Sequence, residues 1–288
     1  MSAAGGRART VVTHLPDAGA TVISRWVFNC IVVHDRGDGR PFVVDLGLPS
    51  HVAEVRAVLH GLGGDLADLG AVVATHGHTD HVAGIPTLAT STPTAVPVLL
   101  PQTVAGFLDG TTPLRSPGPR EIARILPVLA DQPRDLGALR DLAPLTKEIG
   151  YDGRAIRMPL EEPGWLADGD RLPGAPAWEV VHAPGHTDDS TCLYHEPTRT
   201  LISGDAVLSV GGRAWCNPEK VDPERSAATE DRLRALDVDH LLPGHGRPLT
   251  GRALTADALS FRDRPPRSGA LRMLWDVASD RAGRHLHR

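Results

Sequence analysis

The residues best suited to chemistry lie in one short stretch, Thr75-His76-Gly77-His78-Thr79-Asp80-His81. It places three histidines and one aspartate within six positions, and a packed core has no use for such a cluster because imidazole and carboxylate groups are costly to bury unpaired. Both groups are common ligands of zinc and similar cations. The stretch therefore predicts a metal site.

The elements around this stretch must aim its side chains. It directly follows the apolar run Ala71-Val72-Val73-Ala74, which is typical of a buried strand that leads into a loop. Alternate side chains of an extended chain share a face, so we expect His76 and His78 to bind one ion together. Asp80 and His81 come where the chain turns into a predicted helix, and we expect them to serve a neighbouring ion. A polar loop with chance histidines is the alternative, and the density of ligand types disfavours it.

The pattern His76-x-His78-x-Asp80-His81 resembles the signature of the metallo-β-lactamase superfamily. The resemblance implies further motifs downstream, each at the end of a strand, and all of them are present. They are Pro184-Gly185-His186-Thr187, Ser203-Gly204-Asp205, Pro243-Gly244-His245-Gly246 and, upstream, Val43-Val44-Asp45-Leu46-Gly47. Five motifs thus occur in the right order over about residues 20 to 250.

The resemblance implies a role for each ligand. It assigns the first metal to His76, His78 and His186, the second to Asp80, His81 and His245, and the bridging position to Asp205, while Asp45 supports the metal loop from behind. Five neutral imidazoles and two carboxylates suit zinc, two ions per chain, although manganese and iron accept the same ligands. Two ions about 3.5 to 4 Å apart share a water and lower its pKa toward ~7. Asp80 would orient the resulting hydroxide.

This set of ligands predicts a metal-dependent hydrolase that attacks a thioester, ester or lactone with a metal-bridging hydroxide. A mononuclear iron dioxygenase is the second hypothesis, because the persulfide dioxygenases resemble this motif set but use only the first histidines and the aspartate. The presence of both Asp80 and His245 favours two metals. A non-enzymatic scaffold is disfavoured because no ligand is missing. Among the hydrolases, a glyoxalase II usually has a long helical C-terminal domain, whereas about forty residues follow His245. Tyr194 is a candidate for the tyrosine that some lactonases place near their metals.

The pattern of elements predicts an α/β protein in which two stacked mixed β-sheets are flanked by helices, an αββα sandwich. Each half shows a hairpin, an acidic residue at a strand end, a helix, a strand and a histidine. The predicted elements are strands at 21–28, 30–34, 41–45 and 71–74 with helices at 50–62 and 82–88, and then strands at 178–182, 191–195, 200–202 and 239–242 with a helix at 224–236. We expect one domain over residues 1–288, with the metals along one edge of the sandwich.

Residues 101 to 160 differ in pattern from the two halves of the predicted sandwich. Helix-like pieces at 103–108, 120–129 and 136–142 alternate with prolines, and we interpret the segment as a helical cap that shapes the substrate pocket. A decoration remote from the site is the alternative. The nearest groups for substrate recognition are Tyr151, Arg154, Arg157 and Trp165, although packing or surface roles are more typical of such residues. A final helix at 250–262 and a tail at about 263–288 follow, and the tail would dock on the body or in a homodimer.

The overall composition limits the classes of substrate and partner that we expect. The chain has 288 residues, 41% of them apolar, and a formal charge of −5 without a long basic run, which predicts a small-molecule substrate and no nucleic acid. Three cysteines at wide spacing predict buried thiols rather than disulfides. Neither a signal peptide nor an apolar stretch of ~20 residues occurs, so we expect a cytoplasmic protein without a membrane partner. His51 and His60 are expected at solvent-facing or boundary positions of their helix.

Overall fold

The structure is a computed structural model that describes residues 10–34, 39–118, 123–151, 156–158 and 162–260, and the statements below concern these residues. Arg154 and the tail at 263–288 lie outside them. Among the described helices, none is long and apolar enough to cross a membrane.

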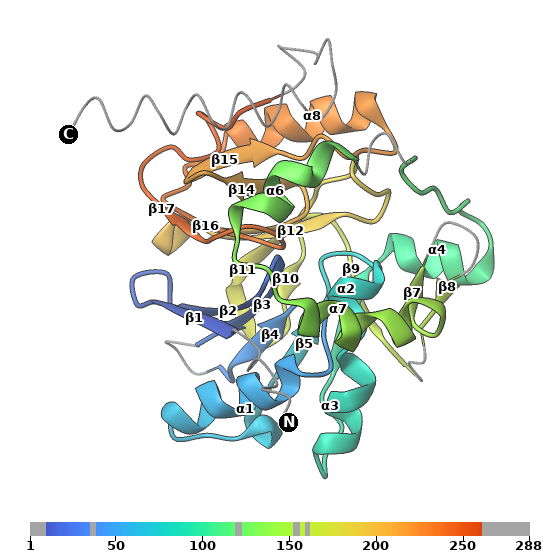
Figure 1. The fold of residues 1–288 in the computed structure, drawn as a ribbon, viewed down its shortest axis with the longest axis vertical. Coiled ribbons are helices and arrows are strands. Elements are labelled where there is room, and N and C mark those ends of the chain that lie inside the picture. The colour runs from blue at the N-terminus through green and yellow to red at the C-terminus, as the bar shows by residue number, and fades with distance from the viewer. Residues whose placement is uncertain (1–9, 35–38, 119–122, 152–155, 159–161, 261–288) are drawn as a thin grey trace, which may run out of the picture.

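Two β-sheets form the centre of the fold (Figure 1). The first has seven strands in the spatial order β1 (Thr10–Leu15), β2 (Ala20–Arg25), β3 (Phe28–Val33), β4 (Phe42–Val44), β5 (Ala71–Val73), β6 (Val98–Pro101) and β9 (Gly164–Leu166). The second has six, in the order β10 (Arg171–Leu172), β11 (Ala175–His182), β12 (Thr191–His195), β13 (Thr200–Gly204), β16 (His240–Pro243) and β17 (Leu249–Thr250). Two short hairpins, β14 (Val207–Val210) with β15 (Arg213–Cys216) and β7 (Gly150–Tyr151) with β8 (Ile156–Arg157), complete the strands.

Helices cover the outer faces of both sheets. Figure 1 shows α1 (His51–Gly61) and α3 (Ile85–Ser91) on one side of the sandwich and α8 (Pro223–Arg234) on the opposite side. The remaining helices are α2 (Thr79–Val82), α4 (Thr103–Asp109), α6 (Leu126–Asp131) and α7 (Leu136–Leu142), with 3-10 turns at η1 (Leu66–Asp68), η2 (Ala123–Ile125), η3 (Ala143–Lys147) and η4 (Glu196–Thr198). Mixed sheets flanked by helices confirm the predicted αββα sandwich.

The central strands are buried on both faces, which explains why they are continuous apolar runs rather than alternating ones. One face of each sheet packs against the other sheet, and the shared core contains Val44, Val73, Trp178, Ile202 and Leu242. The opposite face of the first sheet packs on α1, where Val43 and Val72 share a core with Val55 and Leu59. Leu233 of α8 covers the second sheet in the same way, beside Leu201 and Leu241.

The predicted echo between the halves is present in the strand pairing. β3 and β4 are antiparallel, and β4 then pairs in parallel with β5 after α1. In the second half β12 and β13 are antiparallel, and β13 pairs in parallel with β16 after α8. Because parallel strands end at the same edge of a sheet, the residues that follow β4, β5, β13 and β16 meet at one edge of the sandwich.

Several predicted boundaries differ from the structure. The helix expected at 82–88 is two short helices, α2 and α3, because the backbone N–H of Gly84 donates to the Leu46 carbonyl (2.7 Å) and Pro86 starts a new helix. Of the helix expected at 120–129, residues 120–122 lie outside the described residues, and the rest form the turn η2 followed by α6, whose first turn contains Pro127. α4 and α7 agree with the predicted helices at 103–108 and 136–142.

The predicted helix at 250–262 is wrong over its described part. Thr250 belongs to β17, and residues 251–260 contain turns instead of a helix. Their backbone groups bond to the sandwich: the N–H of Leu254 donates to the Val238 carbonyl (3.0 Å), and that of Leu259 donates to the Ala214 carbonyl (2.9 Å). Pairing with neighbouring segments therefore replaces the hydrogen bonds that a helix would make within itself.

Candidate metal centre

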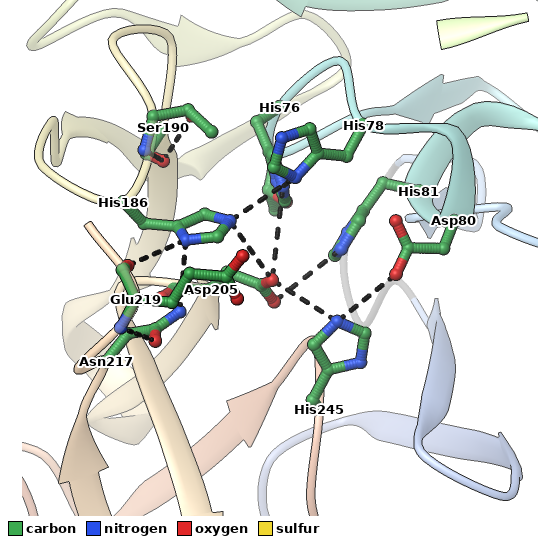
Figure 2. A network of polar contacts seen from close by, with 12 residues as sticks. His76, His78, Asp80, His81, His186, Ser190, Asp205, Asn217, Glu219 and His245 are labelled. Carbon is green, nitrogen blue, oxygen red and sulfur yellow. Dashed lines mark hydrogen bonds and ion pairs between the residues drawn. The ribbon is translucent and has the colours of Figure 1, made fainter. Parts of the chain in front are cut away.

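The residues predicted as ligands lie together at one edge of the sandwich, although they come from both halves (Figure 2). His76 and His78 are in the loop after β5, and Asp80 and His81 begin α2. The other three follow strands of the second half: His186 comes after β11, Asp205 after β13 and His245 after β16. The sheet edge described above thus brings together residues that are 169 positions apart in the sequence (76 to 245).

The side chains form two groups of three. In the first, Nδ1 of His78 lies 3.0 Å from Nε2 of His76 and 3.3 Å from Nε2 of His186. In the second, Nε2 of His245 lies 3.3 Å from Oδ2 of Asp80, and His81 completes the group with its donor atom within 4.8 Å of both.

Asp205 lies between the two groups. Its Oδ2 is 3.5 Å from Nε2 of His186 on one side and 3.2 Å from Nε2 of His245 on the other. Its Oδ1 lies 3.6 Å from Nε2 of His81. This carboxylate, only 4% exposed, therefore touches both groups, as a bridging ligand must.

Hydrogen bonds fix which nitrogen of two of these rings faces the centre. Nδ1 of His186 donates to the carbonyl of Glu219, and Nδ1 of His245 donates to the carbonyl of Val27, both over 2.9 Å. A carbonyl oxygen can only accept, so in the neutral ring the proton is on Nδ1 and Nε2 presents a lone pair to the centre. Figure 2 shows His186 and His245 turned toward Asp205 in this way.

Asp45 holds the loop of the first half from behind, as predicted. Its Oδ1 accepts the backbone N–H of Thr75 (2.7 Å), and its Oδ2 accepts the Thr75 hydroxyl (2.8 Å) and lies 2.9 Å from Nδ1 of His81. Asp45 adopts a positive φ of 60°, which is uncommon for a residue with a side chain and carries a cost in conformational energy. The strained turn at the end of β4 thus places the Asp45 side chain where it makes these three contacts.

His76, His78 and Asp205 have the protonation states that bind a cation. Burial lowers the pKa of His78 to about 3 and holds the pKa of His76 well below its usual value, so both rings are neutral at pH 7. Burial raises the pKa of Asp205, but His245 and His81 outweigh it and hold that pKa well below its ordinary range. Burial also lowers the pKa of His81 and His245, and there the carboxylates outweigh it and raise both pKa values. Protons and a cation would therefore compete for the second group.

The donor set suits divalent cations. Three ring nitrogens converge in the first group, where Nδ1 of His78 lies 3.0 Å from Nε2 of His76 and 3.3 Å from Nε2 of His186. Oδ1 of Asp205 is buried and, among the described residues, accepts no hydrogen bond. Imidazole and carboxylate donors without such partners are what a zinc-type cation would satisfy.

Comparison with known proteins agrees with this geometry. The sequence model described as "Metallo-beta-lactamase superfamily" matches residues 25–245, which contain all of the residues above. The chain belongs to the metallo-beta-lactamase superfamily. Proteins of this superfamily bind divalent metals, and membership supports a metal-dependent hydrolase in general.

Individual members show the same relationship. The chain is 24% identical over 235 residues to the "Probable metallo-hydrolase YflN" of Bacillus subtilis (strain 168), covering 77% of this chain and 81% of that protein. It is 30% identical over 105 residues to the human "Acyl-coenzyme A thioesterase MBLAC2", covering 35% of this chain and 37% of that protein. The crystal structure of the metallo-beta-lactamase family protein TTHA1429 from Thermus thermophilus has a TM-score of 0.51 at 21% identity, covering 94% of this chain and 79% of that one. This likeness confirms the superfamily fold.

Two residues that the sequence analysis considered as candidates near the metals or the substrate, Tyr194 and Trp165, have other surroundings. The hydroxyl of Tyr194 donates to the carbonyl of Asp237 (3.0 Å), and Trp165 is 40% exposed on β9. His51 is fully buried, so the expectation of a solvent-facing or boundary position was wrong, whereas His60 has a 58% exposed side chain as expected.

Two residues that sequence reasoning did not single out as part of the centre lie beside it. Tyr151, expected to be packing or surface, is buried with its ring 4.8 Å from that of His78. Asp189, which is fully buried, accepts hydrogen bonds from the Tyr151 hydroxyl (2.6 Å) and from the backbone N–H of Gly77 (2.8 Å). The only sequence signal for Asp189 is its place three positions after His186, and nothing local identifies Tyr151.

Proposed function

We propose that the protein is a binuclear zinc hydrolase that cleaves a small-molecule thioester, ester or lactone. The observation that best supports this proposal is that Asp205 contacts both groups of three ligands. Its Oδ2 lies 3.5 Å from Nε2 of His186 and 3.2 Å from Nε2 of His245. In this proposal His76, His78 and His186 would hold the first zinc, Asp80, His81 and His245 would hold the second, and Asp205 would be a ligand of both.

The two carboxylates of the centre differ in access, and this difference assigns their roles. A pair of divalent cations, when bound, supplies Lewis acidity and ionises water at neutral pH. The Asp205 side chain is 4% exposed and is surrounded by histidines, so it serves as a ligand. The Asp80 side chain is 24% exposed, and it is the carboxylate that a water entering from solvent would meet. We assign Asp80 the role of orienting that water and holding its proton.

The protonation state of Asp80 supports this role. Burial raises the pKa of its carboxyl, but the hydrogen bond with His245 and the charges of the neighbouring histidines hold the pKa well below the ordinary value. Asp80 is therefore ionised at pH 7 and able to accept a hydrogen bond from water. The proton can then pass to the leaving group through Asp80 or through solvent.

The reaction does not depend on a side-chain nucleophile in this proposal. Cys30, Cys192 and Cys216 are all buried, and burial raises the pKa of each thiol. A buried thiol with a raised pKa is a poor nucleophile. The similarity to the human acyl-coenzyme A thioesterase, although it covers 35% of this chain, favours a thioester as the first substrate class to test.

The test is a substrate panel on protein of known metal content. Thioesters, lactones, simple esters and phosphodiesters would be assayed with zinc-, manganese- and iron-loaded protein, and the metal would be counted in each preparation. We expect two zinc ions per chain and turnover of a thioester, ester or lactone. One iron per chain with consumption of oxygen would instead identify a dioxygenase and contradict the proposal.

A further inference from the structure

His78 is held differently from the other four histidines of the centre. Each of the other rings has its outward nitrogen, Nδ1, in contact with an oxygen atom. The contacts are His76 with Thr75 Oγ1 (3.2 Å), His81 with Asp45 Oδ2 (2.9 Å), His186 with Glu219 O (2.9 Å) and His245 with Val27 O (2.9 Å). Such contacts fix the rotation of an imidazole and the nitrogen that it offers to a metal.

Among the described residues, no oxygen atom contacts the outward nitrogen of the His78 ring in this way. Its Nδ1 points inward, toward His76 and His186, so Nε2 is the outward nitrogen. Within the described part of the chain, no hydrogen bond to Nε2 of His78 is found. A different kind of contact orients this ring.

Tyr151 makes this contact by packing its ring against that of His78. Its ring lies 4.8 Å from the His78 ring at an interplanar angle of 59°, and the two residues also form a parallel β-bridge through their backbones. On its other side the Tyr151 ring meets Phe107 of α4 edge-on at 5.6 Å. The tyrosine thus packs between α4 and the metal loop, with 4% of its surface exposed.

Asp189 locks both partners of this contact in place. Its Oδ1 accepts the Tyr151 hydroxyl (2.6 Å), and its Oδ2 accepts the backbone N–H of Gly77, the residue directly before His78 (2.8 Å). A side chain at Gly77 would not fit, since a Cβ there would lie 2.7 Å from Cε1 of Tyr151. One carboxylate therefore fixes the peptide between His76 and Gly77, next to His78, and the ring that packs against His78.

We infer that Tyr151 and Asp189 are positioning residues that set the orientation of His78 and thereby the metal affinity of the first group. This inference rests on the proposed function, because it takes His78 as a ligand. It also links residues 101–151, through Phe107 and Tyr151, to one ligand of the centre. The positioning acts through hydrogen bonds, so a group of the same shape that can still hydrogen-bond to both partners should preserve it.

Three variants of the full-length zinc-loaded protein test this inference. Tyr151→Phe keeps the ring and removes the hydroxyl, and Asp189→Ala removes both acceptors. Asp189→Asn keeps an oxygen for the Gly77 N–H and offers an N–H₂ group to the Tyr151 oxygen. The matched control is Tyr194→Phe, which removes the hydroxyl that bonds to the Asp237 carbonyl away from the centre. The two zinc dissociation constants would be measured by competition with a chromophoric chelator, and the visible absorption of the cobalt-loaded proteins would report the ligand geometry.

We expect Tyr151→Phe and Asp189→Ala to weaken one zinc about 10-fold or more, to leave the other within about twofold, and to change the cobalt spectrum. Asp189→Asn and Tyr194→Phe should bind both zinc ions as the unaltered protein does. Tyr151→Phe preserves side-chain volume, so it decides the outcome where Asp189→Ala does not fold. Equal affinities in Tyr151→Phe and the unaltered protein, or equal weakening of both zinc ions, would overturn the inference alone. An unaltered protein that binds no zinc would overturn the proposed function as well.

Discussion

Oδ2 of Asp45 lies 2.9 Å from Nδ1 of His81, and both side chains are 1% exposed. The same carboxylate also accepts two hydrogen bonds from Thr75, so one buried group fixes the start of the metal loop and the orientation of a proposed ligand of the second zinc. Partners of this kind tune metal affinity nearly as strongly as the ligands do.

The Asp45→Asn variant should therefore lose metal affinity while keeping its shape. The amide oxygen can still accept the Thr75 N–H, but an N–H₂ group at the other position would meet Nδ1–H of His81, donor against donor. We expect one zinc to bind about 10- to 100-fold more weakly, measured by chelator competition. Asp168→Asn is a suitable control because that carboxylate is 48% exposed on the surface. Unchanged affinity for both zinc ions would contradict the role assigned to Asp45.

His78→Ala should lower metal content and turnover together. It removes the nitrogen that lies 3.0 Å from His76 and 3.3 Å from His186, so the first group keeps two of its three ligands. Metal content measured by elemental analysis and turnover of the best substrate should both fall, whereas neither should fall in the matched control His60→Ala. His60 has a 58% exposed side chain on α1. A fully active His78→Ala protein without metal would rule out the proposed mechanism.

The buried Arg25 joins the cap segment to the first sheet. Its guanidinium lies 3.0 Å from Asp135 and 3.3 Å from Asp141, and it donates to Ser50 at the start of α1. The side chains of Arg25 and Asp135 are each 6% exposed, so removal of the cation leaves a buried carboxylate unpaired. We expect Arg25→Met to lower the free energy of unfolding by about 3 to 5 kcal/mol, measured by urea denaturation.

A second change separates this unpaired charge from lost packing. The double variant Arg25→Met, Asp135→Asn removes both charges, and we expect it to recover a large part of the lost stability. Arg199→Met, which removes a surface cation beside Asp239 with a 51% exposed side chain, should change stability much less. A double variant as unstable as the single one would show that packing, rather than charge, determines the loss.

His51 should make stability depend on pH. Burial and then the charge of Arg25 lower the pKa of His51 to about 3, while an unfolded histidine titrates near 6.5. The unfolded state therefore binds the extra proton between these values, so the contribution of His51 is complete above pH ~6.5 and declines as pH falls toward 3. Between pH 6.5 and 5 the loss amounts to about 2 kcal/mol.

His51→Leu should remove this part of the pH dependence. We expect urea denaturation at fixed zinc concentration to give a flatter profile between pH 7 and 5 for the variant, and the comparison of the two proteins cancels the effect of acid on the metal. At pH 7 the variant should be at least as stable, because among the described residues neither ring nitrogen of His51 has a hydrogen-bond partner. Parallel stability–pH profiles of the two proteins would show that folding does not lower the pKa of His51.

The sequence could predict which groups gather at the candidate metal centre, because ligand type and spacing are local properties. His76, His78, Asp80 and His81 are within one stretch, and the strand ends before His186, Asp205 and His245 are visible as apolar runs. The sandwich followed from the repeated order of hairpin, helix and strand. The contact between Tyr151 and Asp189 could not be predicted, because it joins residues 38 positions apart whose types are common in any protein. The wrong helix at 250–262 failed for a related reason, since backbone bonds of its described part go to Val238, before β16, and to Ala214 of β15, which the local pattern does not reveal.

The ligands proposed for the centre come from the end of β5 and the start of α2 in one half, and from the ends of β11, β13 and β16 in the other. On this assignment the cations act as a cross-link between two layers that are otherwise joined through an apolar interface. Binding of the cations would then add to the free energy of unfolding, because they bind the folded chain. A cell short of zinc would hold a less stable protein as well as a less active one.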